Sequence, residues 1–94
     1  MKFEWDASKN AANIAKHGIS FEEAYEIFNG PIYSKADERN NYGEHRFVSI
    51  GEIGFCVVIV VVHTDRHEKT RIISARLANK IERRLYNDNI KRTN

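Results

Sequence analysis

Titratable and cationic side chains recur where predicted strands and helices end. Glu44 and Arg46 stand two residues apart at the start of a predicted strand, so their side chains should share one face. His63 and Arg66 follow a long apolar run. Polar ends of adjacent elements can form a site beside a rigid core. The candidate catalytic residues are Glu44, Arg46, His63, Arg66, Arg76 and Tyr86.

This set contains the parts needed to cleave RNA through the ribose 2′-hydroxyl. A base must take the 2′-OH proton, cations must stabilise charge on the phosphate, and an acid must protonate the 5′-leaving oxygen. Glu44 or His63 could be the base, and the arginines of the set could hold the phosphate. His63 or Tyr86 could assist the leaving group or stack on a base. An arginine neighbourhood should keep Glu44 ionised and lower the pKa of His63.

Each of these residues also has a structural interpretation. Glu44 and Arg46 could form a surface ion pair that contributes well under ~1 kcal/mol. His63 could be a hydrogen-bonded histidine at a strand end, and Tyr86 could be a helix residue packed by its ring. Composition and spacing alone therefore predict a nucleic-acid-binding domain with a candidate active site.

Metal and cofactor sites are not expected. The four histidines, at positions 17, 45, 63 and 67, have no cysteine partner and no His-Glu-x-x-His pattern. A glycine-rich phosphate loop and a strand-turn-serine element are also missing. Cys56 lies within the apolar run, so we expect a small buried side chain there rather than a nucleophile.

The charge distribution favours a polyanionic partner. Residues 1–47 hold six Lys and Arg against eight Asp and Glu, whereas residues 66–92 hold nine against three. Six of those nine are arginine, which pairs with phosphates bidentately and stacks on bases. A solvated helix face is the alternative explanation. The candidate RNA-binding residues are Lys9, Lys16, His17, Arg71, Lys80 and Arg83.

Length and composition predict one globular domain over residues 1–94. A single cysteine excludes an intrachain disulfide, and the first residues do not resemble a signal peptide. The longest apolar run, residues 55–62, is too short to cross a bilayer as a helix. We therefore expect a cytoplasmic protein without a membrane partner.

The first half of the chain predicts a strand over residues 2–5 and two helices. Asp6 is the expected N-cap of the first helix and Gly18 its end, with an inward face of Ala7, Ala11, Ile14 and Ala15. Ser20 and Glu23 form a capping box that starts the second helix. The apolar stripe of that helix is Phe21, Ala24, Tyr25, Ile27 and Phe28.

The second half predicts four strands and a final helix. The strands are expected at 32–36, 45–50, 55–62 and 70–75, with a turn at 51–54, a turn near 67–69 and a polar loop at 37–43. The helix should follow Ser74 or Ala75 with Leu77, Ala78, Ile81 and Leu85 inward. The expected fold class is α+β, in the order β-α-α-β-β-β-β-α, with an antiparallel meander packed by helices.

A series of short motifs from residue 3 to residue 86 resembles the BrnT family of type II toxins. In chain order the motifs are Phe3-Glu4-Trp5-Asp6; Lys9 and Asn13; Lys16-His17-Gly18-Ile19-Ser20-Phe21-Glu22-Glu23-Ala24; Glu44-x-Arg46 with Ile50-Gly51; Val62-His63-Thr64-x-Arg66; Arg71-Ile72-Ile73-Ser74-Ala75-Arg76-x-Ala78; and Glu82-Arg83 with Tyr86. Residues 32–43 and 51–55 match nothing specific, so substrate preference could differ there.

The resemblance implies a RelE-like fold and a metal-independent endoribonuclease that blocks translation by cutting RNA. It also implies a BrnA-like antitoxin with a ribbon-helix-helix region, encoded in an adjacent gene, and contact with promoter DNA only through the toxin–antitoxin complex. The positions carried over from the family are His17, Glu44, Arg46, His63, Arg66, Arg76 and Tyr86. The alternative is a non-catalytic module of the same fold that binds nucleic acid or antitoxin; a structural or small-ligand domain would predict neither partner.

Overall fold

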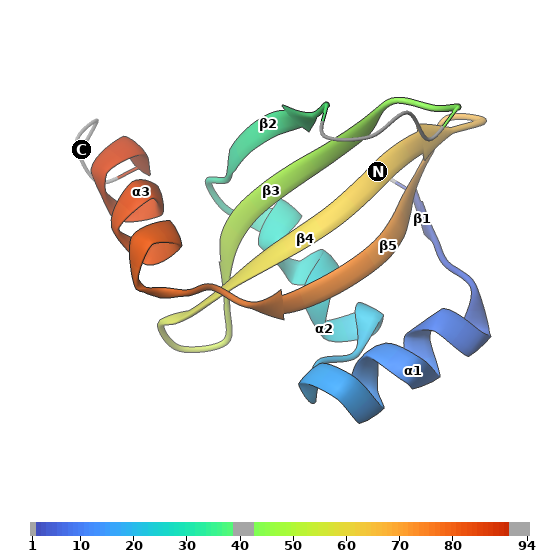
Figure 1. The fold of residues 1–94 in the computed structure, drawn as a ribbon, viewed down its shortest axis with the longest axis horizontal. Coiled ribbons are helices and arrows are strands. Elements are labelled where there is room, and N and C mark those ends of the chain that lie inside the picture. Colours follow the sequence, from blue (N-terminus) through green and yellow to red (C-terminus); the bar gives the residue numbers. More distant parts are fainter. Residues whose placement is uncertain (1, 39–42, 91–94) are drawn as a thin grey trace.

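The computed structural model describes residues 2–38 and 43–90, which form a five-stranded sheet with helices packed against it (Figure 1). The predicted order of elements is confirmed. In chain order the elements are β1 (Lys2–Glu4), α1 (Ala7–His17), α2 (Phe21–Ala24), the 3-10 helix η1 (Tyr25–Asn29), β2 (Tyr33–Asp37), β3 (Arg46–Ile53), β4 (Val57–Arg66), β5 (Lys69–Leu77) and α3 (Lys80–Ile90).

The sheet is mixed, with the strand order β1-β5-β4-β3-β2. Strands β2 to β5 form the predicted antiparallel meander, whereas β1 pairs with β5 in parallel. The predicted meander is therefore confirmed and extended by one parallel edge strand. Among the described residues, no helix is long and apolar enough to cross a membrane.

Alternate residues of the central strand β4 point to opposite faces of the sheet, and both faces carry a core. Ile59 and Val61 pack with residues of α2 and η1, while Val58 and Val60 pack with Tyr86 of α3. We call these the helix-covered face and the open face. On the open face α3 covers only one end of the sheet, at β2 and β3 (Figure 1). The other end is available for a site.

The first helix packs differently from the prediction. Its ends are as expected, since Asp6 accepts a hydrogen bond from the Lys9 amide at 3.0 Å and Gly18 has a φ of 71°. However, the predicted inward residues Ala7, Ala11, Ile14 and Ala15 are exposed, and Asn13 is the buried residue of the helix. The prediction failed because α1 is held by hydrogen bonds at a strand edge and not by an apolar stripe.

Asn13 holds α1 against β5. Its Nδ2 donates to the carbonyls of Ala75 and Ile19, both at 2.8 Å, and its Oδ1 accepts from the Ala75 amide at 3.1 Å. The short strand β1 pairs only with residues 69–71 of β5. The Asn13 amide thus satisfies backbone groups on the part of the β5 edge that β1 does not reach.

The second helix confirms the predicted capping box, and Phe21, Ala24 and Ile27 are fully buried in the helix-covered core. Tyr25, which was predicted in the same stripe, is 38% exposed. Gly51 lies beneath this segment, where an added Cβ would come within 2.6 Å of the Ile27 Cβ. A glycine is therefore needed in β3 for η1 to pack closely on the sheet.

The hairpin between β3 and β4 turns later than predicted. Strand β3 continues to Ile53, and the turn comprises Gly54, Phe55 and Cys56, with positive φ at Gly54 and Cys56. Cys56 is exposed, and Phe55 is 91% exposed, so the expectation of a buried cysteine is wrong. The apolar run concealed the boundary because two of its residues form the turn.

The final helix also begins later than predicted. Strand β5 extends to Leu77 and α3 starts at Lys80. Of the predicted inward residues, Ala78 is buried and Leu85 half-buried, whereas Leu77 and Ile81 are 59% and 78% exposed. The start is set by Asn79 and Glu82, whose side chains accept hydrogen bonds from each other's backbone amides at 2.8 and 2.9 Å. This reciprocal pair is a capping box built on asparagine.

A β-bulge in β5 decides which residues reach the open face. Ser74 pairs with Val62 and Ile72 pairs with the next residue, His63, which leaves Ile73 as the extra residue. Arg71 and Arg76 are five positions apart and would point to opposite faces of a regular strand. The extra residue reverses the alternation, so both arginines lie on the open face while Ile72 enters the helix-covered core.

Candidate active site

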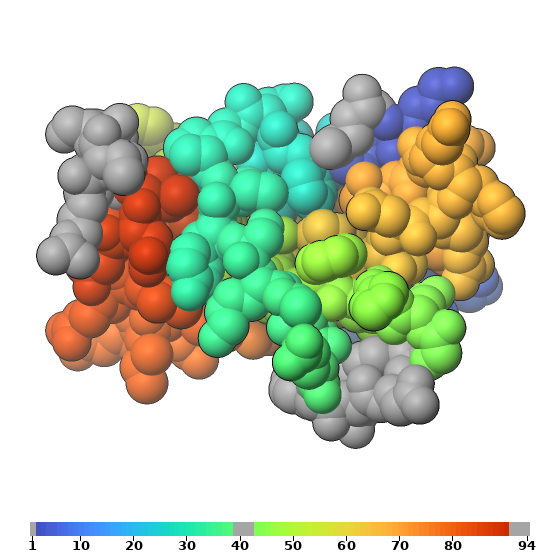
Figure 2. All heavy atoms as spheres, turned by 90° about the horizontal axis from the view of Figure 1, so that it is seen from above, coloured from blue at the N-terminus to red at the C-terminus, as the bar shows by residue number. Residues whose placement is uncertain are grey.

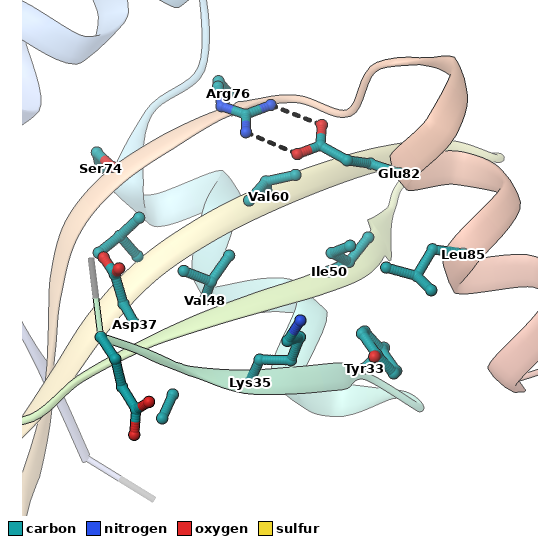
Figure 3. A pocket seen from close by; sticks show the side chains of 13 residues that line it. Tyr33, Lys35, Asp37, Val48, Ile50, Val60, Ser74, Arg76, Glu82 and Leu85 are labelled. Carbon is teal, nitrogen blue, oxygen red and sulfur yellow. Dashed lines mark hydrogen bonds and ion pairs between the residues drawn. The ribbon is translucent and has the colours of Figure 1, made fainter.

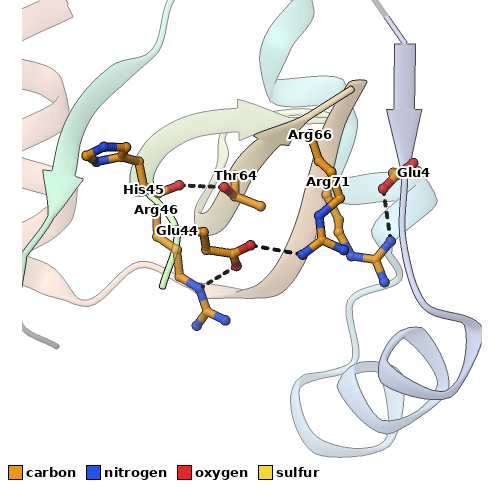
Figure 4. Close-up of polar contacts among 7 residues, drawn as sticks. All are labelled: Glu4, Glu44, His45, Arg46, Thr64, Arg66 and Arg71. Carbon is orange, nitrogen blue, oxygen red and sulfur yellow. Dashed lines mark hydrogen bonds and ion pairs between the residues drawn. The ribbon is translucent and has the colours of Figure 1, made fainter. Parts of the chain in front are cut away.

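Three arginines and two glutamates form a charged cluster at the end of the open face that α3 does not cover (Figure 4). Glu44 accepts hydrogen bonds from Arg46 Nε at 3.2 Å and from Arg66 at 2.9 Å. Arg71 donates to Glu4 at 3.0 Å. We call Glu4, Glu44, Arg46, Arg66 and Arg71 the arginine cluster.

The sheet fixes the positions of this cluster. Arg46 of β3, Thr64 of β4 and Arg71 of β5 are register partners across three adjacent strands. Thr64 is 2% exposed, and its hydroxyl donates to the His45 carbonyl, which ties the start of β3 to β4. The arginine side chains therefore project from a rigid base, as a preorganised site requires.

The ionisation of Glu44 is controlled by the cluster. The hydrogen bond from Arg66, followed by that from Arg46, holds the pKa of the Glu44 carboxyl below its ordinary value. This direction agrees with the prediction that Glu44 stays ionised. A carboxylate of lowered pKa is available at neutral pH, but it is a weaker base than an ordinary glutamate.

Arg76 lies on the same face, next to α3. It pairs with Glu82 through two hydrogen bonds of 2.8 and 2.7 Å (Figure 3). Because Glu82 also caps α3, the start of this helix fixes the orientation of the Arg76 guanidinium. The same hydrogen bonds from Arg76 hold the pKa of Glu82 below its ordinary value. The sequence prediction omitted Glu82, although the pattern Asn-x-x-Glu at 79–82 would have indicated it.

A hollow of about 440 Å³ separates Arg76 from the arginine cluster. Its lining combines aliphatic residues of the sheet with polar residues at the rim (Figure 3). In Figure 2 the strand β2 lies beside α3 along one side of the molecule, and the first residues of β3 lie near the β4–β5 turn at the other end. The lining residues are Tyr33, Lys35, Ala36, Asp37, Glu38, Val48, Ile50, Val60, Val62, Ser74, Arg76, Glu82 and Leu85.

His63 is on the opposite side of the sheet from the arginine cluster. Its ring is packed between Phe47 and Phe28, at centroid distances of 5.7 and 5.1 Å, and the residue is 8% exposed. Nε2 is 2.7 Å from Ser49 Oγ, and Ser49 Oγ is 2.6 Å from Ser34 Oγ. Burial lowers the pKa of His63 and Asp65 opposes the shift, so the predicted direction is confirmed but its cause is not the arginines.

Tyr86 is also buried, at 3% exposure, in the core between α3 and the sheet. Its hydroxyl donates to the Pro31 carbonyl at 3.0 Å, and burial raises its pKa. The structure therefore brings Glu44, Arg46 and Arg66 into direct contact and puts Arg76 on the same face. It does not bring His63 or Tyr86 to that cluster.

The residues predicted to bind RNA lie in three places. Arg71 belongs to the arginine cluster. Lys80 and Arg83 are exposed on α3, close in sequence to Glu82. Lys9 and Lys16 are exposed and His17 half-buried on α1, which packs at the β5 edge. Within residues 2–38 and 43–90, no group of three or more His, Cys, Asp or Glu side chains could hold a metal ion.

An arginine-rich patch on one face of a rigid sheet is typical of proteins that bind a phosphate-containing polymer. Residues 5–82 match the family model for the ribonuclease toxin, BrnT, of type II toxin-antitoxin systems. The chain belongs to this family, and its function is that of a ribonuclease toxin with an antitoxin partner. The wider RelE-like classification stays a prediction.

A solved structure supports the same assignment. The 1.1 Å crystal structure of the Brucella abortus ribonuclease toxin, BrnT, is similar to this chain with a TM-score of 0.65 and 32% sequence identity. The match covers 85% of this chain and 99% of the Brucella chain. No curated protein matches the sequence.

Proposed function

We propose that the open face cleaves RNA at the arginine cluster, by attack of a ribose 2′-hydroxyl on the adjacent phosphate and without a metal ion. The observation that carries the proposal is Glu44 bridging Arg46 and Arg66 on a preorganised sheet end. In this arrangement Glu44 takes the 2′-OH proton, the 2′-oxygen bonds to phosphorus and the bond from phosphorus to the 5′-oxygen breaks. The 5′-oxygen leaves with a proton from solvent water, and the products are a 2′,3′-cyclic phosphate and a 5′-hydroxyl. The guanidinium groups stabilise the charge on the phosphate, which is the task that a bound metal ion performs in other nucleases.

The arginines carry most of the catalytic effect in this mechanism. Glu44 is held ionised by its partners, so it is always ready to accept a proton but is a weak base. Stabilisation of the transition-state phosphate by fixed guanidinium donors supplies the larger part of the rate enhancement. Arg76 binds a neighbouring phosphate or the same one from the α3 side, held in orientation by Glu82. We propose that His63 and Tyr86 support the sheet from the two cores.

Cleavage of RNA would inhibit translation, and the cytoplasm, where mRNA is translated, is the proposed compartment. We also propose that the antitoxin is BrnA-like, with a ribbon-helix-helix region and an adjacent gene. It would bring the toxin to promoter DNA and cover the arginine cluster. The arginine cluster supports this arrangement, because an acidic segment that folds on binding could pair with its guanidinium groups.

Cleavage of a defined RNA by the purified protein tests the mechanism. Arg66→Ala should lower kcat/KM by about 10²- to 10³-fold, the usual effect of removing one transition-state donor. Arg84→Ala, an exposed arginine of α3 outside the proposed site, is the matched control and should change it less than twofold. The wild-type rate should be the same with and without EDTA. Loss of activity in EDTA would overturn metal independence.

Glu44→Gln tests the base separately from the arginines. It preserves the side-chain size and removes the charge, so cleavage should fall while the thermal stability changes little. Full cleavage by Glu44→Gln would remove Glu44 from the mechanism. A folded wild-type protein that binds RNA and the antitoxin without cutting RNA would support the non-catalytic alternative.

A further inference from the structure

Arg76 and Glu82 line one side of the hollow, and the rest of its lining has no role in the proposed cleavage. Its floor is apolar, with Val48 of β3 and its register partner Val62 of β4. Leu85 lies at the side formed by α3 (Figure 3). Tyr33 lies at one side, and polar groups from Lys35 and Asp37 lie at the rim. The volume of about 440 Å³ is in the range of small-molecule sites.

We propose that this hollow binds one nucleobase of the RNA substrate, of the kind that carries an exocyclic amino group. The inference rests on the proposed function, since it adds a specificity subsite beside the cleavage site. An aliphatic floor and an aromatic side wall suit the flat apolar surface of a base. A hydrated phosphate would gain nothing from such a floor.

The charges around the hollow also favour a base over a phosphate. Glu82 is paired with Arg76, and Asp37 is 8% exposed and has a partner of its own, so the exposed Glu38 is the carboxylate that a bound base can reach. A carboxylate accepts hydrogen bonds from the amino groups of cytosine, adenine or guanine. Uracil has a carbonyl oxygen where cytosine has its amino group, and would face Glu38 with an acceptor. The hollow should therefore discriminate against uracil.

The hollow is continuous with the arginine cluster. Asp37 at its rim is the register partner of Arg46, and Val48 is two residues further along β3, a distance of roughly 7 Å. Val48, Val62 and Ser74 are partners across three strands, so the floor follows directly from the row that contains Arg46 and Thr64. A nucleotide with its base over Val48 can therefore present its phosphate to Arg46.

Base removal from the RNA tests the proposal during cleavage. An RNA with one mapped cleavage site is made with a single abasic ribose at each position within two nucleotides of the cut. One abasic position should lower kcat/KM at least tenfold, and a uracil at that position should lower it similarly. If no position costs more than twofold, the hollow does not bind a base and the inference is overturned.

A substitution that fills the hollow tests the same proposal on the protein side. Val62→Phe places a ring in the hollow, whereas Val57→Phe changes the same residue type in the same strand, outside the hollow and 39% exposed. Val62→Phe should lower kcat/KM about tenfold on intact RNA. It should cause no further loss on the sensitive abasic RNA, because the substitution and the missing base remove the same interaction. Val57→Phe should behave as wild type. Additive losses would overturn the inference.

Direct binding separates this inference from the proposed function. Titration with AMP, GMP, CMP and UMP should shift the NMR methyl signals of Val48, Val62 and Leu85, with UMP the weakest, and should leave those of Val57 unchanged. These shifts would support the base site even if the protein failed to cut RNA, which would count only against the proposed function. Absence of shifts, or equal shifts with UMP, would overturn the inference even with cleavage intact.

Discussion

The two faces of the sheet show how the same three strands can serve stability and chemistry. On the helix-covered face, Ser49 of β3 and His63 of β4 are buried, and hydrogen bonds connect them in a chain with Ser34 of β2. On the open face, charged residues of the same strands pair at the surface around Glu44. Burial therefore makes His63 part of the core, whereas Glu44 stays at the surface and can reach a substrate.

The difference between the faces depends on one inserted residue. Without the bulge at Ile73, strand alternation would turn Arg71 inward and Ile72 outward. The arginine cluster and the helix-covered core are thus set by the same local irregularity. Substitutions should disturb the division between the helix-covered core and the open face to different extents.

Exchange of Arg71 and Ile72, by the double substitution Arg71→Ile and Ile72→Arg, should have the largest effect. Ile72 lies in the helix-covered core and Arg71 pairs with Glu4 on the open face, so the exchange puts a charge into the core and removes the ion pair with Glu4. Burial of an unpaired charge together with the loss of a core residue should cost more than about 4 kcal/mol. We expect no cooperative thermal transition by circular dichroism. Ile73→Val leaves both residues in place and should cost at most about 1.5 kcal/mol; an exchange variant with native stability would contradict this account.

Asn13→Leu should cost about 3 kcal/mol of unfolding free energy, since it removes two hydrogen bonds to Ala75 of β5 and one to the Ile19 carbonyl. Urea denaturation measures this loss. Asn89→Leu, at an exposed position of α3, is the control and should remain within about 0.5 kcal/mol. The cleavage rate of the folded fraction should not change, because the open face is left intact. A loss of rate without a loss of stability would assign Asn13 a role that we do not propose.

Glu82→Gln should lower kcat about tenfold, equivalent to about 1.4 kcal/mol, because Arg76 loses the partner that orients it. The KM for RNA should stay constant or fall, since a negative charge is removed from the open face. Glu26→Gln, an exposed residue of η1, serves as the control. A fall in stability with kcat unchanged would limit Glu82 to capping α3.

His63 should give the smallest effect, and only below neutral pH. Because burial puts its folded-state pKa below the ordinary 6.5, the unfolded chain takes up the proton first as the pH falls. Stability should be constant above about pH 6.5 and should decrease below it, down to the folded-state pKa, with a slope of at most about 1.4 kcal/mol per pH unit. His63→Gln should flatten this slope in urea denaturation between pH 5 and 7.5.

The control for this experiment is His45→Gln, at an exposed position one strand away, which should keep the wild-type slope. An unchanged slope in His63→Gln would show that another group titrates. If His63→Gln abolished cleavage at full stability, the histidine would return to the catalytic mechanism.

Local signals predicted the elements whose ends depend on caps and turns. Asp6, Gly18 and the Ser20–Glu23 box gave the first helix and the start of the second, since a cap acts within one turn of the chain. The same kind of signal failed where it competed with an apolar run, at the turn around Phe55 and at the end of β5. The packing of α1 was also missed, because one buried asparagine leaves no apolar periodicity.

The candidate site was only partly predictable for a related reason. Glu44 and Arg46 are two residues apart on one strand, so their shared face follows from strand geometry. The pairing of Arg66 with Glu44 joins residues 22 positions apart and depends on the β3–β4 register. The separation of His63 from the cluster depends on which face of the sheet the helices cover.

The sequence by itself determined the α+β order of elements, the positive charge of the second half and the family, because these follow from local composition and motif spacing. Only the tertiary structure decided that Arg71 and Arg76 share the open face, that His63 and Tyr86 are buried, and that Glu44 joins two arginines. The physical reason is that a strand gives each residue one of two sides. A single bulge, together with the helices on one face, decides which side becomes core and which stays open to RNA.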